Sequence, residues 1–409
     1  MTATEVRLRV GTKRCLSHRS DPPVLLSLTT QRERAAMPNL TVSGVRTTIV
    51  DLPILRPHRF ANHSIDAQTY LLVEVVTDAG FVGLGEGVSP GGPWWGGESI
   101  EGQKQIIDCY LAPALIGSDV EDLAGTRRQL DRIAFANLFA KAALETALLD
   151  AIGQAHNVAL STLLGGATRT ELPLRWPLSG AGTGGTLEEA AERVAAGYRR
   201  IKFKMGALAP REDIDRVGEL VDKIGDGVDY LGDPNGTWDL RTATWAVREL
   251  EAIGLSAVEQ PVERRDVRGL AELRSRADRI DIMADESVCV PADALEVVRE
   301  RACDSVAVKP GKAGGLRAAA LIAAILDTAS IGPYGGTALE SPVGTAASAH
   351  LFATFPRLLH GCELVGPLLL ADSVITEPLA YTDGILTVPT GPGLGVRLDH
   401  DKVDRYRRR

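Results

Sequence analysis

The chain has 409 residues and a formal net charge of −8, and 44% of its residues are hydrophobic. A net negative charge argues against nucleic acid or an anionic membrane surface as the partner, so we expect a small molecule. Five scattered cysteines without CxxC spacing indicate reduced thiols and a cytoplasmic protein rather than a disulfide framework. No apolar run approaches the roughly 18 residues that a membrane helix needs.

The N-terminal stretch, residues 1–37, differs from the rest of the chain. It holds several arginines, few acids and no clear hydrophobic periodicity. A transit peptide needs an amphipathic helix, and Pro22 and Pro23 interrupt this stretch. We therefore expect a disordered extension, with the folded protein beginning near Met37.

Residues 38–165 have the pattern of an α+β domain. Alternating strand patterns cover Leu40 to Leu52 and Thr69 to Glu86, the second of which turns at Asp78-Ala79-Gly80. Helical patterns then run from Ile100 to about Asn157. We expect this capping domain to share one interface with the domain that follows, and pockets favour such junctions.

From residue 166 to residue 372, short apolar runs alternate with helical patterns about every 25 residues. Repeated strand and helix units of this kind form right-handed parallel βαβ units, and eight of them close into a TIM-type (β/α)8 barrel. An open doubly wound sheet is the alternative, but no glycine-rich nucleotide-binding fingerprint follows the first strand. The expected strands begin at Leu172, Arg200, Asp229, Leu255, Asp281, Asp304, Ser330 and Leu358.

The C-terminal segment, residues 373–409, contains the run LAYTDGILTV, which predicts a hairpin that turns at Asp383-Gly384. This hairpin comes after the expected eighth strand. We therefore expect the segment, hairpin included, to return to the N-terminal capping domain.

Two lysines occupy the expected second barrel strand, RIKFKMG. Because side chains alternate along a strand, Lys202 and Lys204 share one face, while Ile201, Phe203 and Met205 share the other. The lysines then point into the barrel mouth, where TIM-barrel enzymes keep their active sites. Lysines that blunt an exposed edge strand are the alternative.

Each of the next three strands ends in an acid: Asp233, Glu259 and Asp285. Anions that repel one another in a concave site need a counter-ion, and a hard divalent cation with oxygen ligands meets that need. Since no histidine or cysteine lies at these strand ends, the pattern favours Mg²⁺ or Mn²⁺ over Zn²⁺. Asn235 and Glu286 lie beside these acids and are candidates for orienting them.

The sixth and eighth expected strands add Lys309 and Glu363. Lys309 is four strands away from Lys204, so the two amines lie on opposite walls of an eight-stranded barrel. A substrate at the metal would have an amine on each side. We expect a lysine close to a dication and to other lysines to have a lowered pKa, which suits proton transfer.

The combination of KxK, an aspartate, EQP, ADE and a strand lysine resembles the enolase superfamily, in its muconate cycloisomerase branch. Further stretches resemble the same branch: RPH from Arg56, GGES from Gly96, YGGTALESPVGTAASAHLFAT from Tyr334, CELVGPLLL from Cys362 and PTGPGLGVRLD from Pro389. The resemblance covers nearly all of the chain after Met37.

The resemblance implies a divalent-metal isomerase that converts cis,cis-muconate, or a substituted muconate, to a muconolactone in aromatic-compound catabolism. It implies that Asp233, Glu259 and Asp285 hold Mg²⁺ or Mn²⁺ and that Lys202 stabilises an enediolate. Lys204 is then the acid/base for syn addition, Lys309 the residue placed for anti addition, and Glu363 an orienting group. It also implies a small dicarboxylate substrate and a homo-oligomer.

Two loops of the capping domain are candidates for choosing the substrate. Arg56, His58 and His63 could receive the distal carboxylate, and Trp94 and Trp95 could form an apolar lid. Packing within the loops and at the domain interface is the alternative for each of them.

Two other functions fit parts of the pattern. Racemisation or epimerisation of N-acylamino acids or dipeptides needs the same opposed lysines. That reading expects a pair of acids on the last strand, where Cys362-Glu363-Leu364 offers one. A non-catalytic barrel is the third reading, and the intact set of acids and lysines speaks against it.

Overall fold

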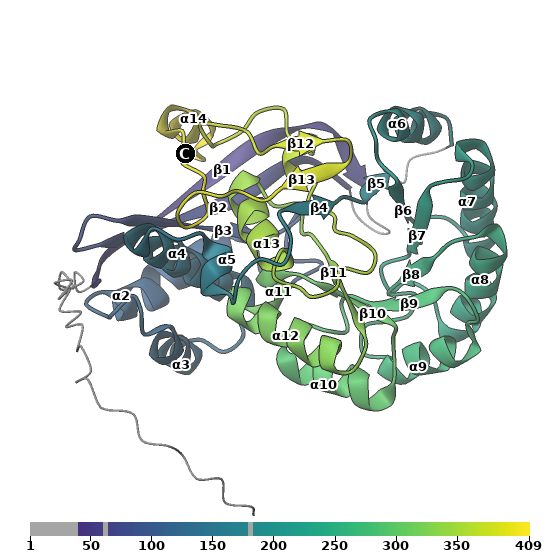
Figure 1. The fold of residues 1–409 in the computed structure, drawn as a ribbon, viewed down its shortest axis with the longest axis horizontal. Helices are drawn as coiled ribbons and strands as arrows, with labels where there is room; N and C mark the ends of the chain where they lie inside the picture. The colour runs from purple at the N-terminus through teal and green to yellow at the C-terminus, as the bar shows by residue number, and fades with distance from the viewer. Residues whose placement is uncertain (1–39, 60–63, 179–182) are drawn as a thin grey trace, which may run out of the picture. The chain divides into compact units, whose positions relative to one another are not determined.

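The computed structural model describes residues 40–59, 64–178 and 183–409 (Figure 1). Its N-terminal part is an antiparallel sheet in the order β1-β2-β3, whose strands are β1 (Val42–Arg59), β2 (Ser64–Thr77) and β3 (Val82–Val88). Helices cover one face of this sheet: α1 (Ile100–Ile106), the π-helical turn η1 (Ile107–Leu111), α2 (Ala112–Leu115), α3 (Leu123–Ile133), α4 (Leu138–His156) and α5 (Leu160–Leu163).

The barrel contains seven parallel strands in sequence order, each followed by a helix on the outside (Figure 1). The strands are β5 (Trp176–Leu178), β6 (Arg200–Lys204), β7 (Asp229–Asp233), β8 (Ala257–Glu259), β9 (Asp281–Ala284), β10 (Ser305–Val308) and β11 (Gly332–Gly335). The helices are α6 (Thr183–Ala195), α7 (Pro210–Ile224), α8 (Leu240–Ile253), α9 (Val267–Arg276), α10 (Pro291–Glu300), α11 (Pro310–Ala313), α12 (Leu316–Thr328) and α13 (Pro342–Phe352), followed by the 3₁₀ turn η2 (Gly366–Leu369).

The eighth barrel position differs from the expectation, because the run from Leu358 does not form a strand. Cys362 alone makes parallel bridges, to Gly335 on one side and to Leu174 on the other. Gly361 has φ +78° and ends the extended backbone before Cys362. After Cys362, the Val365 amide donates a hydrogen bond to the Glu363 carbonyl at 2.7 Å, so the chain turns there. The barrel is therefore closed through a single residue, and the predicted TIM-type barrel with a capping domain is confirmed.

The predicted hairpin forms, but it joins a different sheet from the one expected. Strands β12 (Tyr381–Thr382) and β13 (Ile385–Thr387) pair with β4 (Glu171–Pro173), the strand that leads into the barrel. Leu386 lies opposite Leu172, and both are fully buried, so this register gives the hairpin an apolar partner. The expectation that the hairpin itself packs on the capping domain is wrong.

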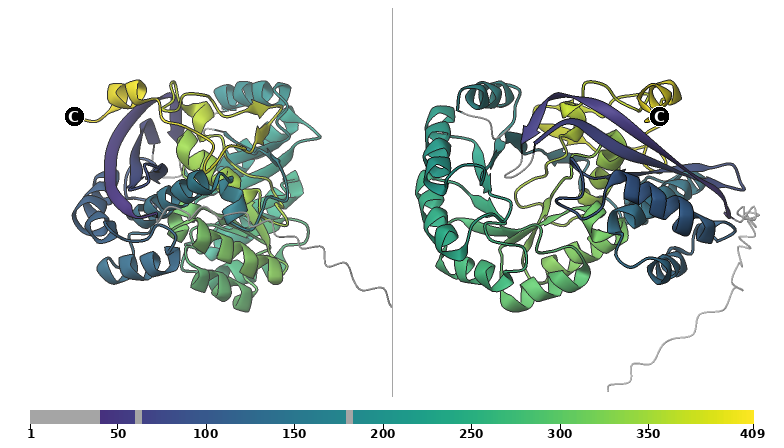
Figure 2. Two further views of the ribbon diagram at one scale, coloured as in Figure 1. Left: turned by 60° about the vertical axis from the view of Figure 1, so that its left-hand side comes forward. Right: turned by 180° about the vertical axis from the view of Figure 1, so that it is seen from behind.

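The chain returns to the capping domain after the hairpin. The Leu160 amide donates to the Gly393 carbonyl at 2.8 Å, and Arg407 forms a bridge with Val50 of β1. The last helix, α14 (His400–Tyr406), lies beside β1, near the end of the chain in Figures 1 and 2. The C-terminal segment thus completes the capping domain, as predicted.

Below its mouth, the barrel interior is filled by side chains. One layer consists of an apolar cluster: Leu231, Ala257, Met283, Ala307 and Tyr334. Arg175 lies below with no exposed surface and donates to the carbonyls of Ile201 and Asp229 and to the Asp229 carboxylate. The strand ends above this packed plug are therefore held at fixed positions.

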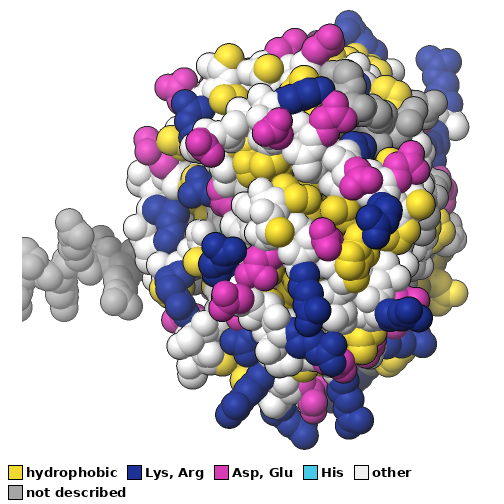
Figure 3. All heavy atoms as spheres, turned by 90° about the vertical axis from the view of Figure 1, so that its right-hand side faces the viewer, with side chains coloured by type: hydrophobic (Ala, Val, Ile, Leu, Met, Phe, Trp, Pro, Cys, Tyr) yellow, Lys and Arg dark blue, Asp and Glu magenta, His cyan; other side chains and the backbone are white. Residues whose placement is uncertain are grey.

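Positive and negative side chains are interspersed on the face formed by the outer barrel helices (Figure 3). The exposed large hydrophobic residues of the described chain include Phe135 and Leu55. Among the described residues, no helix combines the length and the apolar character needed to cross a bilayer.

Two contacts join the capping sheet to the barrel next to its mouth. Glu86 of β3 accepts hydrogen bonds from the Ser341 amide at 2.9 Å and the Gly344 amide at 3.1 Å, at the start of α13. These amides have no partner within the helix, and the carboxylate also complements the helix dipole. Tyr70 of β2 donates its hydroxyl to the Leu339 carbonyl at 2.8 Å. Both contacts fix the loop between β11 and α13.

Asp150 of α4 joins three parts of the capping domain. Its carboxylate accepts from the Leu84 amide at 2.8 Å, the Leu394 amide at 2.6 Å and the Gln154 side chain at 2.9 Å. A Cβ atom at Gly393 would meet the carboxylate at 2.0 Å, so only glycine permits this approach of the C-terminal segment. These hydrogen bonds lower the pKa of Asp150. Burial outweighs them and raises this pKa from 3.8 to about 6.

This raised pKa predicts a pH-dependent stability. Between pH 3.8 and about 6, Asp150 is protonated in the folded protein and ionised in the unfolded chain, so stability falls as pH rises. In Asp150→Asn this titration is absent. The stability of the parent relative to the variant should therefore fall by about 2 kcal/mol from pH 4 to pH 6.5, measured by urea unfolding. A stability difference that does not change with pH would contradict the prediction.

Candidate active site

The two lysines of β6 project into the barrel. β6 lies between β5 and β7, so it is not an edge strand. Lys202 is 1% and Lys204 9% exposed, and their neighbours Ile201 and Phe203 are fully buried on the opposite face. The alternative of edge-strand lysines is therefore wrong.

Lys202 contacts three carboxylates. Its Nζ lies 2.9 Å from Asp233, 2.8 Å from Glu259 and 3.0 Å from Glu363. Burial lowers the pKa of this lysine, but the three carboxylates outweigh it and raise the pKa well above its ordinary value. Lys202 is therefore a permanently charged group among these acids.

Lys204 lies closer to the mouth, where its Nζ is 2.6 Å from Asp233 and 3.4 Å from Asn235. Asn235 has a left-handed backbone with φ 48°. Its amide group also reaches Glu286 at 3.3 Å. Asn235 thus connects the Asp233 side of the site to Glu286.

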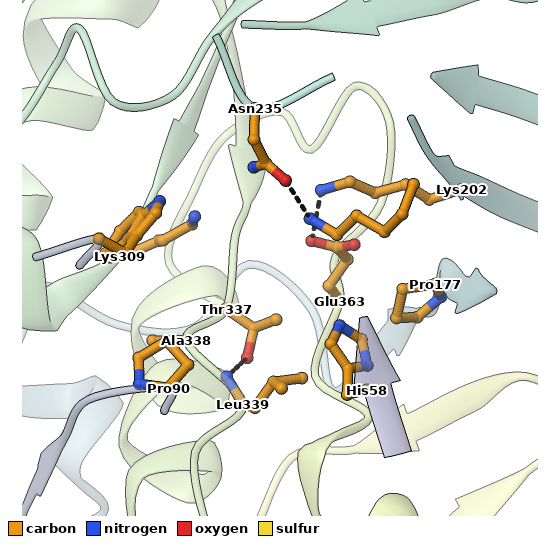
Figure 4. A pocket seen from close by; sticks show the side chains of 12 residues that line it. His58, Pro90, Pro177, Lys202, Asn235, Lys309, Thr337, Ala338, Leu339 and Glu363 are labelled. Atoms are coloured by element: carbon orange, nitrogen blue, oxygen red, sulfur yellow. Dashed lines mark hydrogen bonds and ion pairs between the residues drawn. The ribbon is translucent and has the colours of Figure 1, made fainter. Parts of the chain in front are cut away.

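Lys309 directly follows β10 and lies on the opposite wall from Glu363 and Lys202 (Figure 4). Its Nζ is 2.6 Å from Asp285 and 4.3 Å from the ring centroid of Trp95. Burial lowers the pKa of Lys309, but Asp285 and Glu259 raise it above its ordinary value. Lys202 and Lys309 each lie on a carboxylate here, so the lowered lysine pKa expected beside a dication stays a prediction.

Two residues that hold the acids were not found from the sequence. Lys312 of α11 places its Nζ 2.6 Å from Asp285. Gln260 accepts hydrogen bonds from the amides of Asp285 at 2.9 Å and Ser287 at 3.1 Å. Gln260 belongs to the EQP motif, and Lys312 follows Lys309 by three residues. Their closeness in the sequence to predicted site residues is the signal by which both could have been found.

The three acids at the ends of β7, β8 and β9 have the chemistry of a hard-cation site. Asp233, Glu259 and Asp285 are each at most 1% exposed, and Glu259 Oε1 has no hydrogen-bond partner in the described part of the chain. Burial raises the pKa of Glu259 to about 8, and Asp233, Asp285 and Glu363 add to the rise. The lysines lower the pKa of Asp233 to about 2 against the effect of burial. An unpartnered oxygen among repelling carboxylates fits a divalent cation.

With the side chains as they stand, the described residues contain no group of three or more His, Cys, Asp or Glu arranged around one point to hold a metal ion. The lysine ammonium groups lie between the carboxylates instead. The cavity above them is small, with about 30 Å³ of room for the centres of water-sized spheres.

Residues from both domains line this cavity. They include His58, Trp95, Lys202, Lys204, Asn235, Lys309, Leu339 and Glu363 (Figure 4). Burial lowers the pKa of His58 well below its ordinary value, and nearby Lys204 and Arg56 lower it further. A neutral imidazole therefore faces the cavity.

The other capping residues expected at the substrate lie elsewhere. Arg56 is not among the cavity-lining residues: its guanidinium pairs with Glu189 of α6 at 2.6 Å and donates to the Pro177 carbonyl at 3.1 Å. Trp94 does not line the cavity either, and its indole donates to the Pro90 carbonyl. His63 lies outside the described residues, as does the expected extension, residues 1–37.

Family models match both parts of the chain. Residues 44–165 match the mandelate racemase / muconate lactonizing enzyme N-terminal domain, and residues 185–402 match the enolase C-terminal domain-like family. The chain belongs to the mandelate racemase and muconate lactonizing enzyme family. The resemblance to the enolase superfamily is confirmed.

Similar members of this family are cycloisomerases. Muconate cycloisomerase 1 of Rhodococcus opacus is 42% identical over 91% of this chain and 100% of its own length. The crystal structure of 2-chloromuconate cycloisomerase from Rhodococcus opacus 1CP has a TM-score of 0.88, with 42% identity over 90% of this chain and 100% of that chain. That of muconate lactonizing enzyme from Pseudomonas fluorescens complexed with muconolactone has a TM-score of 0.88, with 38% identity over the same shares. The predicted muconate cycloisomerase branch is confirmed.

The position of Arg56 predicts a structural role rather than substrate binding. Arg56→Ala and Glu189→Ala should each lower stability and kcat/KM to a similar extent, because both break the contact between β1 and α6. Their effects should be non-additive in a double-mutant cycle, measured by thermal unfolding and steady-state kinetics.

Arg357→Ala, which removes an exposed pair with Asp327, is the control and should change stability by less than about 1 kcal/mol. A rise in KM confined to Arg56→Ala would instead identify Arg56 as a substrate ligand.

Proposed function

We propose that this isomerase converts cis,cis-muconate or a substituted muconate to a muconolactone. The observation that supports this most is the arrangement of three buried acids on β7, β8 and β9 between lysines on two opposite walls. A flat dicarboxylate between these walls would have one carboxylate at the acids and an amine above each face. The likeness to muconate and chloromuconate cycloisomerases over about 90% of the chain supports the same substrate class.

In this proposal, Asp233, Glu259 and Asp285 hold a divalent cation, Mg²⁺ or Mn²⁺. When bound, the cation supplies a Lewis acid that draws negative charge onto one carboxylate of the substrate. Asn235 and Glu286 restrain these ligands through the contacts among Lys204, Asn235, Glu286 and Trp95.

The lysines carry out the other parts of the reaction. The distal carboxylate of the substrate attacks the conjugated double bond, one C–O bond forms, and negative charge moves to the other carboxylate as an enediolate. Lys202 is permanently charged and stabilises this enediolate. Lys204 then delivers one proton to the adjacent carbon, which gives the lactone. Lys309 faces the other side of the substrate and orients it as a cation, and Glu363 holds Lys202 in place.

The neutral imidazole of His58 and the indole of Trp95 are proposed to contact the rest of the substrate. Both line the cavity, whereas Arg56 and Trp94 do not. The preference for muconate or a halogenated relative is then set by the apolar wall formed by Trp95, Pro90 and Leu339. We also propose that the protein is cytoplasmic and that it is a homo-oligomer. Light scattering on the purified protein tests the oligomeric state.

Lysine variants test the assignment of the acid. Lys204→Ala should lower kcat for muconate by about 10²-fold to 10⁴-fold, the usual contribution of a general acid. Lys223→Ala, which removes an exposed lysine paired with Glu219 of α7, is the control and should leave kcat unchanged.

The face of proton delivery can be read directly. Product formed in D₂O should carry one deuterium on the face of Lys204, as read by NMR. Deuterium on the face of Lys309, or turnover of Lys204→Ala within a few-fold of the parent, would contradict the assignment. Exchange of the α-proton of N-acylamino acids without muconate turnover would favour the racemase reading.

Metal removal tests the proposed cation. Dialysis against a chelator should abolish muconate turnover, and Mn²⁺ or Mg²⁺ should restore it. Since the cation binds only the folded protein, it should also raise the melting temperature, measured by calorimetry. Full activity after chelation would contradict the proposed site.

A further inference from the structure

We propose that Lys312 is a positioning residue that fixes the Asp285 carboxylate for cation binding. This role rests on the proposed function, because it assumes that Asp285 is a cation ligand.

Both oxygens of Asp285 are occupied by lysines. Lys309 Nζ lies 2.6 Å from Oδ2, and Lys312 Nζ lies 2.6 Å from Oδ1. Lys312 also donates to the backbone carbonyl of Asp285. A single ammonium group that binds the side chain and the backbone of one residue restrains both its position and its rotamer.

The two lysines differ in what else they can reach. Lys309 lines the catalytic cavity and lies against Trp95, so it can turn toward a substrate. Lys312 does not line that cavity, and it is 3% exposed. When Lys309 leaves Asp285, Oδ2 becomes available to a cation, while Lys312 still holds Oδ1. The permanent contact and the exchangeable contact are thus assigned to different lysines.

The short helix that carries Lys312 cannot shift easily. α11 follows Lys309 directly, and a Cβ atom at Gly311 would meet the Phe139 ring of α4 at 2.8 Å. Gly314, which follows α11, has φ +81°, and a Cβ atom there would meet the Leu138 side chain at 2.9 Å. Lys312 is therefore held against the capping domain, and it transmits that fixed position to Asp285.

A second cavity of about 280 Å³ lies on the other side of Lys312. Its lining includes Asn137, Arg264, Cys289 and Lys312, and it shares only Trp95 with the lining of the catalytic cavity. A small amine can therefore approach the position of the Lys312 ammonium without passing through the substrate site. This geometry makes chemical rescue a specific test.

The experiment measures Mn²⁺ binding to the substrate-free protein by calorimetry and by electron paramagnetic resonance. Lys312→Met keeps the aliphatic stem and should weaken Mn²⁺ binding about 10-fold to 100-fold, as loss of a ligand-orienting partner usually does. Lys312→Arg keeps the charge and should recover most of the affinity. Lys312→Ala should regain affinity when ethylammonium is added, whereas Lys312→Met should not respond, because its side chain still fills the space.

Lys141→Met is the matched control. Lys141 is also a buried lysine, 2% exposed, and its Nζ binds a carboxylate, Asp131, at 2.7 Å and a backbone carbonyl, Ala134, at 2.7 Å. Lys141→Met should destabilise the capping domain, as seen by thermal unfolding, without changing Mn²⁺ affinity.

Equal Mn²⁺ affinity in the parent and Lys312→Met would overturn the role of Lys312. An equal loss of affinity in Lys141→Met would also overturn it, because the effect would then follow stability alone. Absence of Mn²⁺ binding by the parent would overturn the proposed cation site itself, which separates that failure from the failure of this inference.

Discussion

The repulsion among the buried acids at the ends of β7, β8 and β9 is the constraint on which the rest of the site depends. Asp233 and Glu259 share the ammonium group of Lys202, and Asp285 binds those of Lys309 and Lys312, in a region almost without solvent exposure. Buried carboxylates of this kind are tolerated only when cations neutralise them. Lys202, Lys204, Lys309 and Lys312 supply those charges from three different elements. A divalent cation can take the place of a lysine in some of these lysine–carboxylate ion pairs. Each lysine that is replaced then has a free ammonium group.

The barrel provides this arrangement because parallel strands end at the same edge. The registers align Lys204 with Asp233, and they align Glu259 with Met283, whose side chain lies on the same face as that of Asp285 two residues later. The apolar layer around Tyr334 and the buried Arg175 fill the space below, so the charged groups cannot sink into the barrel. The fold thus holds a set of like charges that would separate on a flexible scaffold.

The sequence predicts the features of the site that follow from the alternation of side chains along a strand and from the positions of strand ends. Alternation along RIKFKMG places both lysines on one face, and acids at strand ends predict a common edge. The eighth barrel position could not be predicted as a bridge, because the left-handed Gly361 depends on the tertiary contacts around it. The pairing of Arg56 with Glu189 could not be predicted, because the two residues lie 133 positions apart in the chain. Lys312 was missed because its contact with Asp285 depends on how α11 turns after β10.

The capping domain is part of the charge balance and not only a cover. Trp95 presents its ring to Lys309 and donates its indole N–H to Glu286 at 2.8 Å. An aromatic face stabilises an ammonium group by about 0.5–2 kcal/mol, so Trp95 favours the orientation in which Lys309 stays near Asp285. Movement of the loop that carries Trp95 would weaken both contacts together. The position of the capping loop and the choice of Lys309 between Asp285 and a substrate are therefore coupled through one side chain.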